Sequence, residues 1–141
     1  MALPQVESVR VPFGEVAGRL KTALESAPPS VVAAYLFGSV ARGEAREGSD
    51  VDVAVLFSAP TEPILGNAAN HLECDLERVL RRTVQVVELN KANADLVHRV
   101  LRDGVILLDR DRGARIEFEV RLRNEYFDLE PIRRMYRGTA S

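Results

Sequence analysis

Two aspartates stand two positions apart near the middle of this chain, in the segment Ser49-Asp-Val-Asp-Val-Ala-Val-Leu56. In an extended strand, residues i and i+2 point to the same face, so Asp50 and Asp52 would lie side by side with Cα atoms roughly 6.5–7 Å apart. Adjacent carboxylates repel each other unless a cation lies between them. Mg²⁺ takes oxygen ligands and commonly bridges carboxylates to substrate phosphates. The pair therefore predicts a magnesium site.

A glycine-serine turn precedes the two aspartates. Gly38-Ser39 follows an apolar run that ends at Phe37, and we expect a short helix to begin at Val40 with Ser39 near its N-cap. Free backbone N–H groups at such a turn suit a phosphate, and glycine lets the backbone come close to it. Arg42 follows as a candidate phosphate ligand, since guanidinium groups pair well with phosphate. A phosphate cradle beside a metal clamp predicts nucleotide chemistry.

The pattern of Gly38-Ser39, ten further residues and Asp50-Val-Asp52 resembles the signature of minimal nucleotidyltransferases, members of the DNA polymerase beta-like superfamily. It fixes several residues over about 15 positions, which makes it far more specific than a lone glycine motif. The alternative is a surface turn followed by a strand with two solvated aspartates. The resemblance implies ATP as substrate, two Mg²⁺ ions held by Asp50 and Asp52, and a nucleotide-binding set of Gly38, Ser39, Arg42 and Ser49.

The third acid of this family's site has no counterpart at the expected position. The resemblance places it near the start of the strand after the long helix, where this chain has Val84-Gln85-Val-Val-Glu-Leu89. Gln85 is neutral and cannot act as a base, although its carbonyl oxygen can still face a metal. Strand parity puts Glu88 on the opposite face from Gln85. Three hypotheses stay open. Nucleotide transfer is impaired with Gln85 as a weak metal ligand, Glu88 or another acid replaces the missing carboxylate, or the chain binds nucleotide without turnover.

Apolar periodicity predicts an alternation of helices and strands around this motif. We expect an α/β (α+β) fold, a small mixed sheet flanked by helices, which the resemblance identifies as the nucleotidyltransferase fold. Helices are expected from residue 12 to the prolines at 28–29, over 63–82, between 93 and 104, and over 111–129, where Pro131 would break the last one. Strands are expected at 31–37, within 49–56, at 84–89 and at 105–108.

Composition limits the remaining possibilities. The chain has 141 residues, a net charge of −2 and one cysteine, so we expect a single domain over 1–141 without an intrachain disulfide. The chain contains no basic stripe, so we do not expect it to bind DNA directly. We find no signal peptide and no apolar run long enough to span a membrane, so we expect a cytoplasmic protein. Residues 111–141 would form a C-terminal helical segment.

Chain length and this C-terminal segment resemble the antitoxin half of HEPN/MNT toxin–antitoxin pairs. The resemblance implies a hetero-oligomer in which the chain transfers AMP from ATP to a tyrosine of a HEPN ribonuclease toxin and thereby neutralises it. Little of the chain remains to build an acceptor domain, so a partner would bring the acceptor. The alternatives are a non-catalytic antitoxin that acts by binding alone, and a small-molecule nucleotidyltransferase that needs a partner subunit. Candidate contact residues are the aromatics Phe118, Tyr126, Phe127 and Tyr136.

Overall fold

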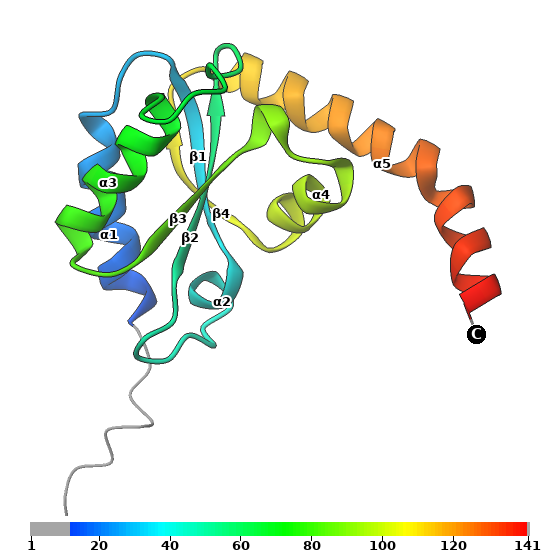
Figure 1. The fold of residues 1–141 in the computed structure, drawn as a ribbon, viewed down its shortest axis with the longest axis horizontal. Coiled ribbons are helices and arrows are strands. Elements are labelled where there is room, and N and C mark those ends of the chain that lie inside the picture. The colour runs from blue at the N-terminus through cyan, green and yellow to red at the C-terminus, as the bar shows by residue number, and fades with distance from the viewer. Residues whose placement is uncertain (1–11, 141) are drawn as a thin grey trace, which may run out of the picture.

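The computed structural model describes residues 12–140, without the side chains of residues 129, 130, 133 and 136–140. Its elements follow the predicted alternation (Figure 1): α1 (Phe13–Glu25), β1 (Val31–Phe37), α2 (Gly38–Ala41), β2 (Val51–Phe57), α3 (Ala68–Leu80), β3 (Val84–Glu88), the 3-10 helix η2 (Leu89–Lys91), α4 (Ala94–Asp103), β4 (Val105–Asp109) and α5 (Arg112–Ala140). The strands form one sheet in the order β3-β2-β1-β4. Only β2 and β3 pair in parallel, so the sheet is mixed, and the predicted fold class is confirmed.

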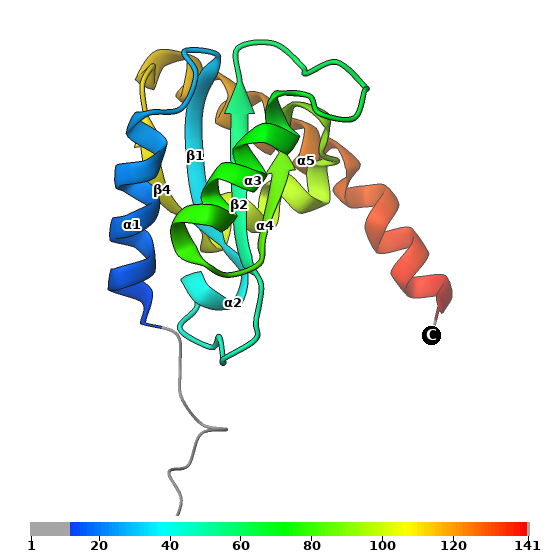
Figure 2. The ribbon, with the colours of Figure 1, turned by 60° about the vertical axis from the view of Figure 1, so that its left-hand side comes forward.

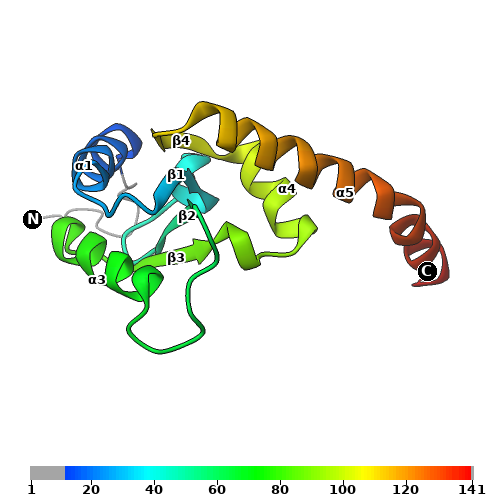
Figure 3. The same ribbon diagram turned by 90° about the horizontal axis from the view of Figure 1, so that it is seen from above.

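Helices cover both faces of the sheet. Seen from above, α1 and α3 lie on one side and α4 and α5 on the other (Figure 3). Val51, Val53 and Val55 are fully buried in the cluster that includes the apolar residues of α1 and α3. Because side chains alternate along a strand, Asp52 points to the other face, towards α4 and α5. The same alternation puts Ala54 into the second apolar cluster.

Two carboxylates of α3 hold the free edge of β3. Glu77 accepts a hydrogen bond from the backbone N–H of Val84 at 3.1 Å, and Glu73 accepts one from Val86 at 2.8 Å. These N–H groups lie on the outer edge of the sheet, where no neighbouring strand accepts them. The two bonds fix β3 beside β2 and shield an edge that would otherwise be open to another strand.

Arg110 ties the end of β4 to the end of α1. Its guanidinium donates to the carbonyl of Pro28 at 2.6 Å, to that of Ala27 at 2.8 Å and to that of Glu25 at 3.2 Å. The last carbonyls of a helix have no partner within the helix, and a cation there also offsets the helix dipole. Arg110 therefore fixes the junction between α1 and β1.

Two predicted helix starts were wrong. The helix expected from residue 63 begins at Ala68, because Asn67 caps it by accepting the N–H of Asn70 at 3.0 Å. Ile64 and Leu65, which we placed on its apolar face, lie in the preceding loop and are 58% and 97% exposed. The short helix α2 begins at Gly38 rather than Val40, and no side chain caps it.

The prediction that Pro131 breaks the last helix was also wrong. Helix α5 runs for 29 residues with Pro131 inside it. A proline removes one helical hydrogen bond and bends the helix, but the helix can continue past it where the flanking residues have high helix propensity. The C-terminal half of α5 consequently extends away from the sheet (Figures 1 and 3).

No helix in the range 12–140 is both long enough and apolar enough to cross a membrane.

Candidate active site

The turn after β1 lies directly against Asp52. Phe37, the last residue of β1, pairs with Asp52 on β2, and Gly38 follows with φ of +77°. A Cβ atom added at Gly38 would collide with Oδ2 of Asp52 and lie 3.1 Å from its Cγ. Glycine is therefore required twice, once for the left-handed backbone and once for the close approach. The turn, α2 and the start of β2 lie together at one end of the sheet (Figure 2).

Asp52 is half-buried, whereas Asp50 is exposed and precedes the first residue of β2. Burial raises the pKa of the Asp52 carboxyl above its ordinary value, the charge of Asp50 raises it further, and the guanidinium of Arg42 lowers it in part. A carboxylate that is partly desolvated beside a second carboxylate favours a bound cation. Oδ2 of Asp52 lies against the glycine turn, and a pair of carboxylates of this kind fits Mg²⁺, which binds one or two protein carboxylates and keeps coordination sites for substrate phosphates.

Gln85 lies beside Asp52 in the sheet. The parallel register of β2 and β3 pairs Asp52 with Gln85, and paired residues on neighbouring strands point to the same face. The Gln85 side chain is exposed, as a group facing an open site must be. Three strands thus converge here: β1 brings the glycine turn, β2 the carboxylates and β3 the amide.

Residues 19–113 match the family described as polymerase beta, nucleotidyltransferase. The chain belongs to this nucleotidyltransferase family. A solved structure described as a minimal nucleotidyltransferase is 30% identical, with a TM-score of 0.54, and the match covers 67% of this chain and 95% of that chain. Comparison with curated protein sequences finds no significant match.

Toxin–antitoxin complexes are among the solved structures similar to this nucleotidyltransferase. One, a toxin–antitoxin structure with AMP-PNP, is 27% identical with a TM-score of 0.73, over 88% of this chain and 97% of that chain. Another contains a tri-AMPylated Shewanella oneidensis HEPN toxin in complex with an MNT antitoxin. It has 24% identity and a TM-score of 0.70, over 92% of this chain and 98% of that chain, and shows the shared fold.

Glu88 does not take the place of the missing acid in this nucleotidyltransferase. It pairs with Val55, three residues along β2 from Asp52. Its carboxylate accepts hydrogen bonds from the backbone N–H of Thr61 at 2.8 Å and from the Thr61 hydroxyl, and Lys91 lies 3.6 Å away. Within residues 12–140, no three His, Cys, Asp or Glu side chains are grouped to hold a metal. This geometry therefore gives no support to rescue of the site by Glu88.

The other predicted phosphate ligands differ in the contacts that their side chains already make. The Ser49 hydroxyl accepts the backbone N–H of Arg46 at 3.0 Å, so it stabilises the loop that leads into Asp50. Arg42 contacts Glu44 at 3.4 Å, a weak and exposed pair, and its charge acts on Asp52. Ser39 is half-buried at the glycine turn. Arg42 and Ser39 thus remain candidate phosphate ligands, whereas the Ser49 hydroxyl already accepts one bond within the loop and keeps its O–H as a donor.

Sequence reasoning missed the residues of α4 that lie near this site. Asp103 accepts two hydrogen bonds from Arg102, both at 3.0 Å, and these bonds, followed by the charges of Arg102 and Arg42, lower the pKa of its carboxyl. His98 stacks on Tyr126 with ring centroids 3.8 Å apart, whereas we expected Tyr126 to contact a partner protein. Arg102 and Asp103 are neighbours in the sequence, but only the fold brings them near Arg42, and His98 meets Tyr126 only because α4 packs against α5.

Proposed function

We propose that this chain is the antitoxin of a HEPN/MNT pair and transfers AMP from Mg-ATP to a tyrosine hydroxyl of its HEPN toxin partner. One observation carries the proposal: the glycine turn lies in contact with Asp52, so that a phosphate cradle and a metal clamp form one centre. The likeness to a toxin–antitoxin structure with AMP-PNP supports the partner and the nucleotide. With ATP as its substrate, the chain would work in the cytoplasm.

In this mechanism the tyrosine oxygen attacks the α-phosphorus and the bond to pyrophosphate breaks, so AMP-tyrosine, pyrophosphate and a proton are formed. Bound Mg²⁺ would neutralise the triphosphate and stabilise the charge that develops on it. Asp50 and Asp52 would hold it. The backbone N–H groups after Gly38 would orient the phosphates, with Arg42 adding charge. Positioning of this kind accounts for most of the catalysis of phosphoryl transfer.

Gln85 shapes how fast this reaction runs. In the register of the sheet it pairs with Asp52, and a carboxylate at this position would complete the proposed metal site. Its amide oxygen can contact the metal or the acceptor hydroxyl, but an amide cannot take up the hydroxyl proton. The proton would leave to water, and transfer would be slow but not abolished.

The partner would dock on α5. Ile116, Val120 and Phe127 form an apolar stripe at helical spacing and are 41%, 48% and 62% exposed. Of the aromatics expected to contact the partner, Phe118 is instead in the core and Tyr126 stacks on His98. The side chain of Tyr136 lies outside the described part of the chain. Phe127 is the aromatic that remains available for a partner.

A second function is favoured by Gln85 alone. Without a third acid, the chain could bind nucleotide and toxin yet transfer nothing, and neutralise the toxin by covering its active site. The stripe on α5 would serve this function equally well.

Intact-mass measurement separates the two functions. The chain is purified with its native partner, incubated with ATP and Mg²⁺, and both proteins are weighed. An AMP added to the partner, absent with Asp52→Asn, supports transfer. A stable complex without any mass change supports neutralisation by binding. Failure to form a complex would overturn both.

A further inference from the structure

The glycine turn has an aspartate on each side. On the side of β2 lies Asp52, whose carboxylate a side chain at Gly38 would strike. On the side of β4, the antiparallel register pairs Leu36 with Val105. Asp103, two residues before Val105, therefore lies at the same end of the sheet as Gly38, two residues after Leu36. The proposed mechanism uses Asp52, and Asp103 has no part in it.

The last turn of α4, which carries Asp103, is packed tightly against the end of β1. A Cβ atom added at Gly104 would collide with the carbonyl oxygen of Val100 and would lie 3.4 Å from that of Leu36. Helix α4 also packs against α2, the short helix that contains the glycine turn. The fold thus holds Asp103 near this turn, with its side chain only 26% exposed.

Arg42 is a cation that acts on both of these aspartates. It follows the last residue of α2, one turn after the glycine. Burial and the charge of Asp50 raise the pKa of Asp52, and the charge of Arg42 lowers it in part. The pKa of Asp103 is lowered first by the hydrogen bonds from Arg102, and then by the charges of Arg102 and Arg42. Arg42 is therefore close enough to interact with either carboxylate.

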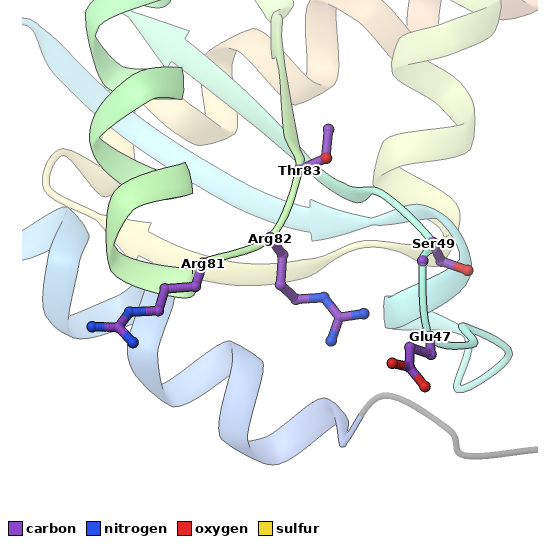
Figure 4. A pocket seen from close by; sticks show the side chains of 6 residues that line it. Glu47, Ser49, Arg81, Arg82 and Thr83 are labelled. Atoms are coloured by element: carbon purple, nitrogen blue, oxygen red, sulfur yellow. The ribbon is translucent and has the colours of Figure 1, made fainter. Parts of the chain in front are cut away.

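Two other arginines near the start of β2 lie away from this turn. They line a pocket of about 440 Å³ (Figure 4), whose lining is Glu47, Gly48, Ser49, Arg81, Arg82 and Thr83. Neither Asp50 nor Asp52 lines this pocket, and Arg81 and Arg82 also line a hollow with α1, on the opposite face of the sheet. Arg42 is thus better placed than these two arginines to serve a phosphate at the glycine turn.

The carboxylate of Asp103 is itself held in a fixed orientation. Nε and Nη2 of Arg102 donate to its two oxygens, both at 3.0 Å. Paired hydrogen bonds of this kind fix the plane of a carboxylate. Asp103 therefore offers Arg42 a second anion besides Asp52. Without that anion, the guanidinium of Arg42 would be drawn more strongly to Asp52, the carboxylate that the proposed metal needs.

We propose that Asp103 is a positioning residue for the nucleotide: it keeps the guanidinium of Arg42 at the phosphate cradle and away from Asp52. This inference rests on the proposed binding of Mg-ATP at this centre and names what orients its arginine. Mg²⁺ then meets Asp52 without a competing cation, and the triphosphate meets a cation that is already directed towards it. Asp103 acts through Arg42 and touches neither the metal nor the nucleotide.

The sign of one binding effect tests this role. Removing a negative charge near a triphosphate should by itself strengthen binding. If Asp103 positions Arg42, Asp103→Asn should instead raise the Kd for Mg-AMP-PNP by about fivefold, a typical coupling between neighbouring residues. Asp103→Glu, which keeps the charge, should restore part of the affinity. Titration calorimetry on the full chain measures these constants and requires neither turnover nor a partner.

A double-mutant cycle shows whether Asp103 acts through Arg42. Arg42→Gln should raise the Kd by about tenfold, the effect of losing one charge-assisted contact. In the Arg42→Gln background, Asp103→Asn should raise the Kd no further. Asp75→Asn is the matched control, because Asp75 forms an exposed pair with Arg78 on α3, on the opposite face of the sheet. It should leave the Kd unchanged, and thermal unfolding should shift little in either aspartate variant.

Three outcomes would overturn the inference. The first is an unchanged or lower Kd in Asp103→Asn, as expected from charge alone. The second is an equal rise in the Kd when Arg42 is already replaced by glutamine, which would show that Asp103 acts independently of it. The third is an equal effect of Asp75→Asn, which would show a general effect of net charge.

These outcomes are distinct from those of the proposed transfer. If Asp103→Asn raises the Kd through Arg42 but the partner gains no AMP, the positioning role stands and the transfer does not. Transfer of AMP with an unchanged Kd in Asp103→Asn would have the opposite meaning. A parent chain that does not bind Mg-AMP-PNP would overturn both.

Discussion

At the scale of single residues, the burial of Asp52 in the candidate active site lowers the stability of the fold at neutral pH. Its carboxyl is held half-buried beside Asp50, and both burial and that charge raise its pKa in the folded chain. The folded state therefore binds this proton more tightly than the unfolded state does. Stability from this group is present at low pH and is lost as pH rises from the ordinary value of 3.8 through the raised one.

Asp52→Asn should therefore raise the free energy of unfolding at pH 7 in metal-free buffer and abolish AMP transfer. The gain should disappear as the pH falls below 4, where the aspartate is protonated in both states. Urea denaturation between pH 3.5 and 8 measures it. Asp50→Asn is the comparison, since Asp50 is exposed and should change stability less. A variant less stable than the parent at pH 7 would contradict the burial argument.

Gly38 and Gly43 form a matched pair of glycines. Both have positive φ, +77° and +73°, but an added Cβ meets Asp52 only at Gly38 and meets nothing within 4 Å at Gly43. Alanine at either position should cost about 1–2 kcal/mol of stability through the left-handed backbone. Only Gly38→Ala should also displace the Asp52 carboxylate, and hence lose Mg-ATP binding. Calorimetry and thermal unfolding of both variants check this. Equal loss of nucleotide binding would contradict it.

Gln85→Asp should restore the third carboxylate beside Asp52. We expect transfer to the partner to rise by about tenfold or more, the scale on which groups around a metal alter activity. Gln85→Asn is the control, because it has the length of aspartate without its charge. The measurement is the initial rate of partner labelling at saturating Mg-ATP. If the aspartate and asparagine variants transfer at the same rate, Gln85 has no part in the metal site.

At the scale of elements, long-range contacts fix where the site's strands end. Glu73 and Glu77 of α3 hold the outer edge of β3, and Arg110 beyond β4 holds the end of α1. These contacts keep β1, β2 and β3 in the register that brings the glycine turn, Asp52 and Gln85 together.

Arg110→Ala should destabilise the fold by about 1–3 kcal/mol, because it leaves several carbonyls without their donor. The urea midpoint gives the free energy, and hydrogen exchange should show faster opening at the end of α1. Arg99→Ala removes an exposed arginine from α4 and should change stability by less than about 0.5 kcal/mol. If the two substitutions have equal effects, water satisfies these carbonyls as well as Arg110 does.

At the scale of the whole molecule, α5 has an anchored half and a projecting half. Arg115 bonds Asp109 at 2.9 Å and Glu119 at 2.7 Å, and Phe118 and Leu122 are buried in the core. Beyond these contacts the helix leaves the body of the protein (Figure 1). The apolar stripe begins on the anchored half with Ile116 and Val120 and continues to Phe127 beyond it, and such exposed apolar side chains are costly in water unless something covers them.

Phe127→Asp should weaken binding of the toxin partner roughly thirtyfold, which corresponds to about 2 kcal/mol for a central aromatic contact. Stability of the isolated chain should hardly change, since Phe127 is 62% exposed. Asn124→Asp adds the same charge one turn earlier, between Val120 and Phe127, without removing an apolar side chain, and should weaken binding less than Phe127→Asp. Titration calorimetry with the partner checks both. Normal binding by Phe127→Asp would place the interface elsewhere.

The sequence by itself determined the elements and the central motif. Short-range signals carry this information: a nearly continuous apolar run predicted β1 from Val31 to Phe37, and the spacing of Val16, Leu20 and Leu24 predicted α1. The glycine turn with its aspartates indicated nucleotide chemistry. The predicted helix ends were wrong in two kinds of place. At Asn67 a side-chain cap sets the start of α3, and at Pro131 the helix continues through a residue that usually ends one.

Only the tertiary structure decided which residues meet. Gln85 stands beside Asp52 because β3 pairs in parallel with β2, and Glu88 is drawn away by Thr61. Register and burial depend on contacts across the whole fold, whereas periodicity and motifs depend on neighbours, and only the latter can be read along the chain.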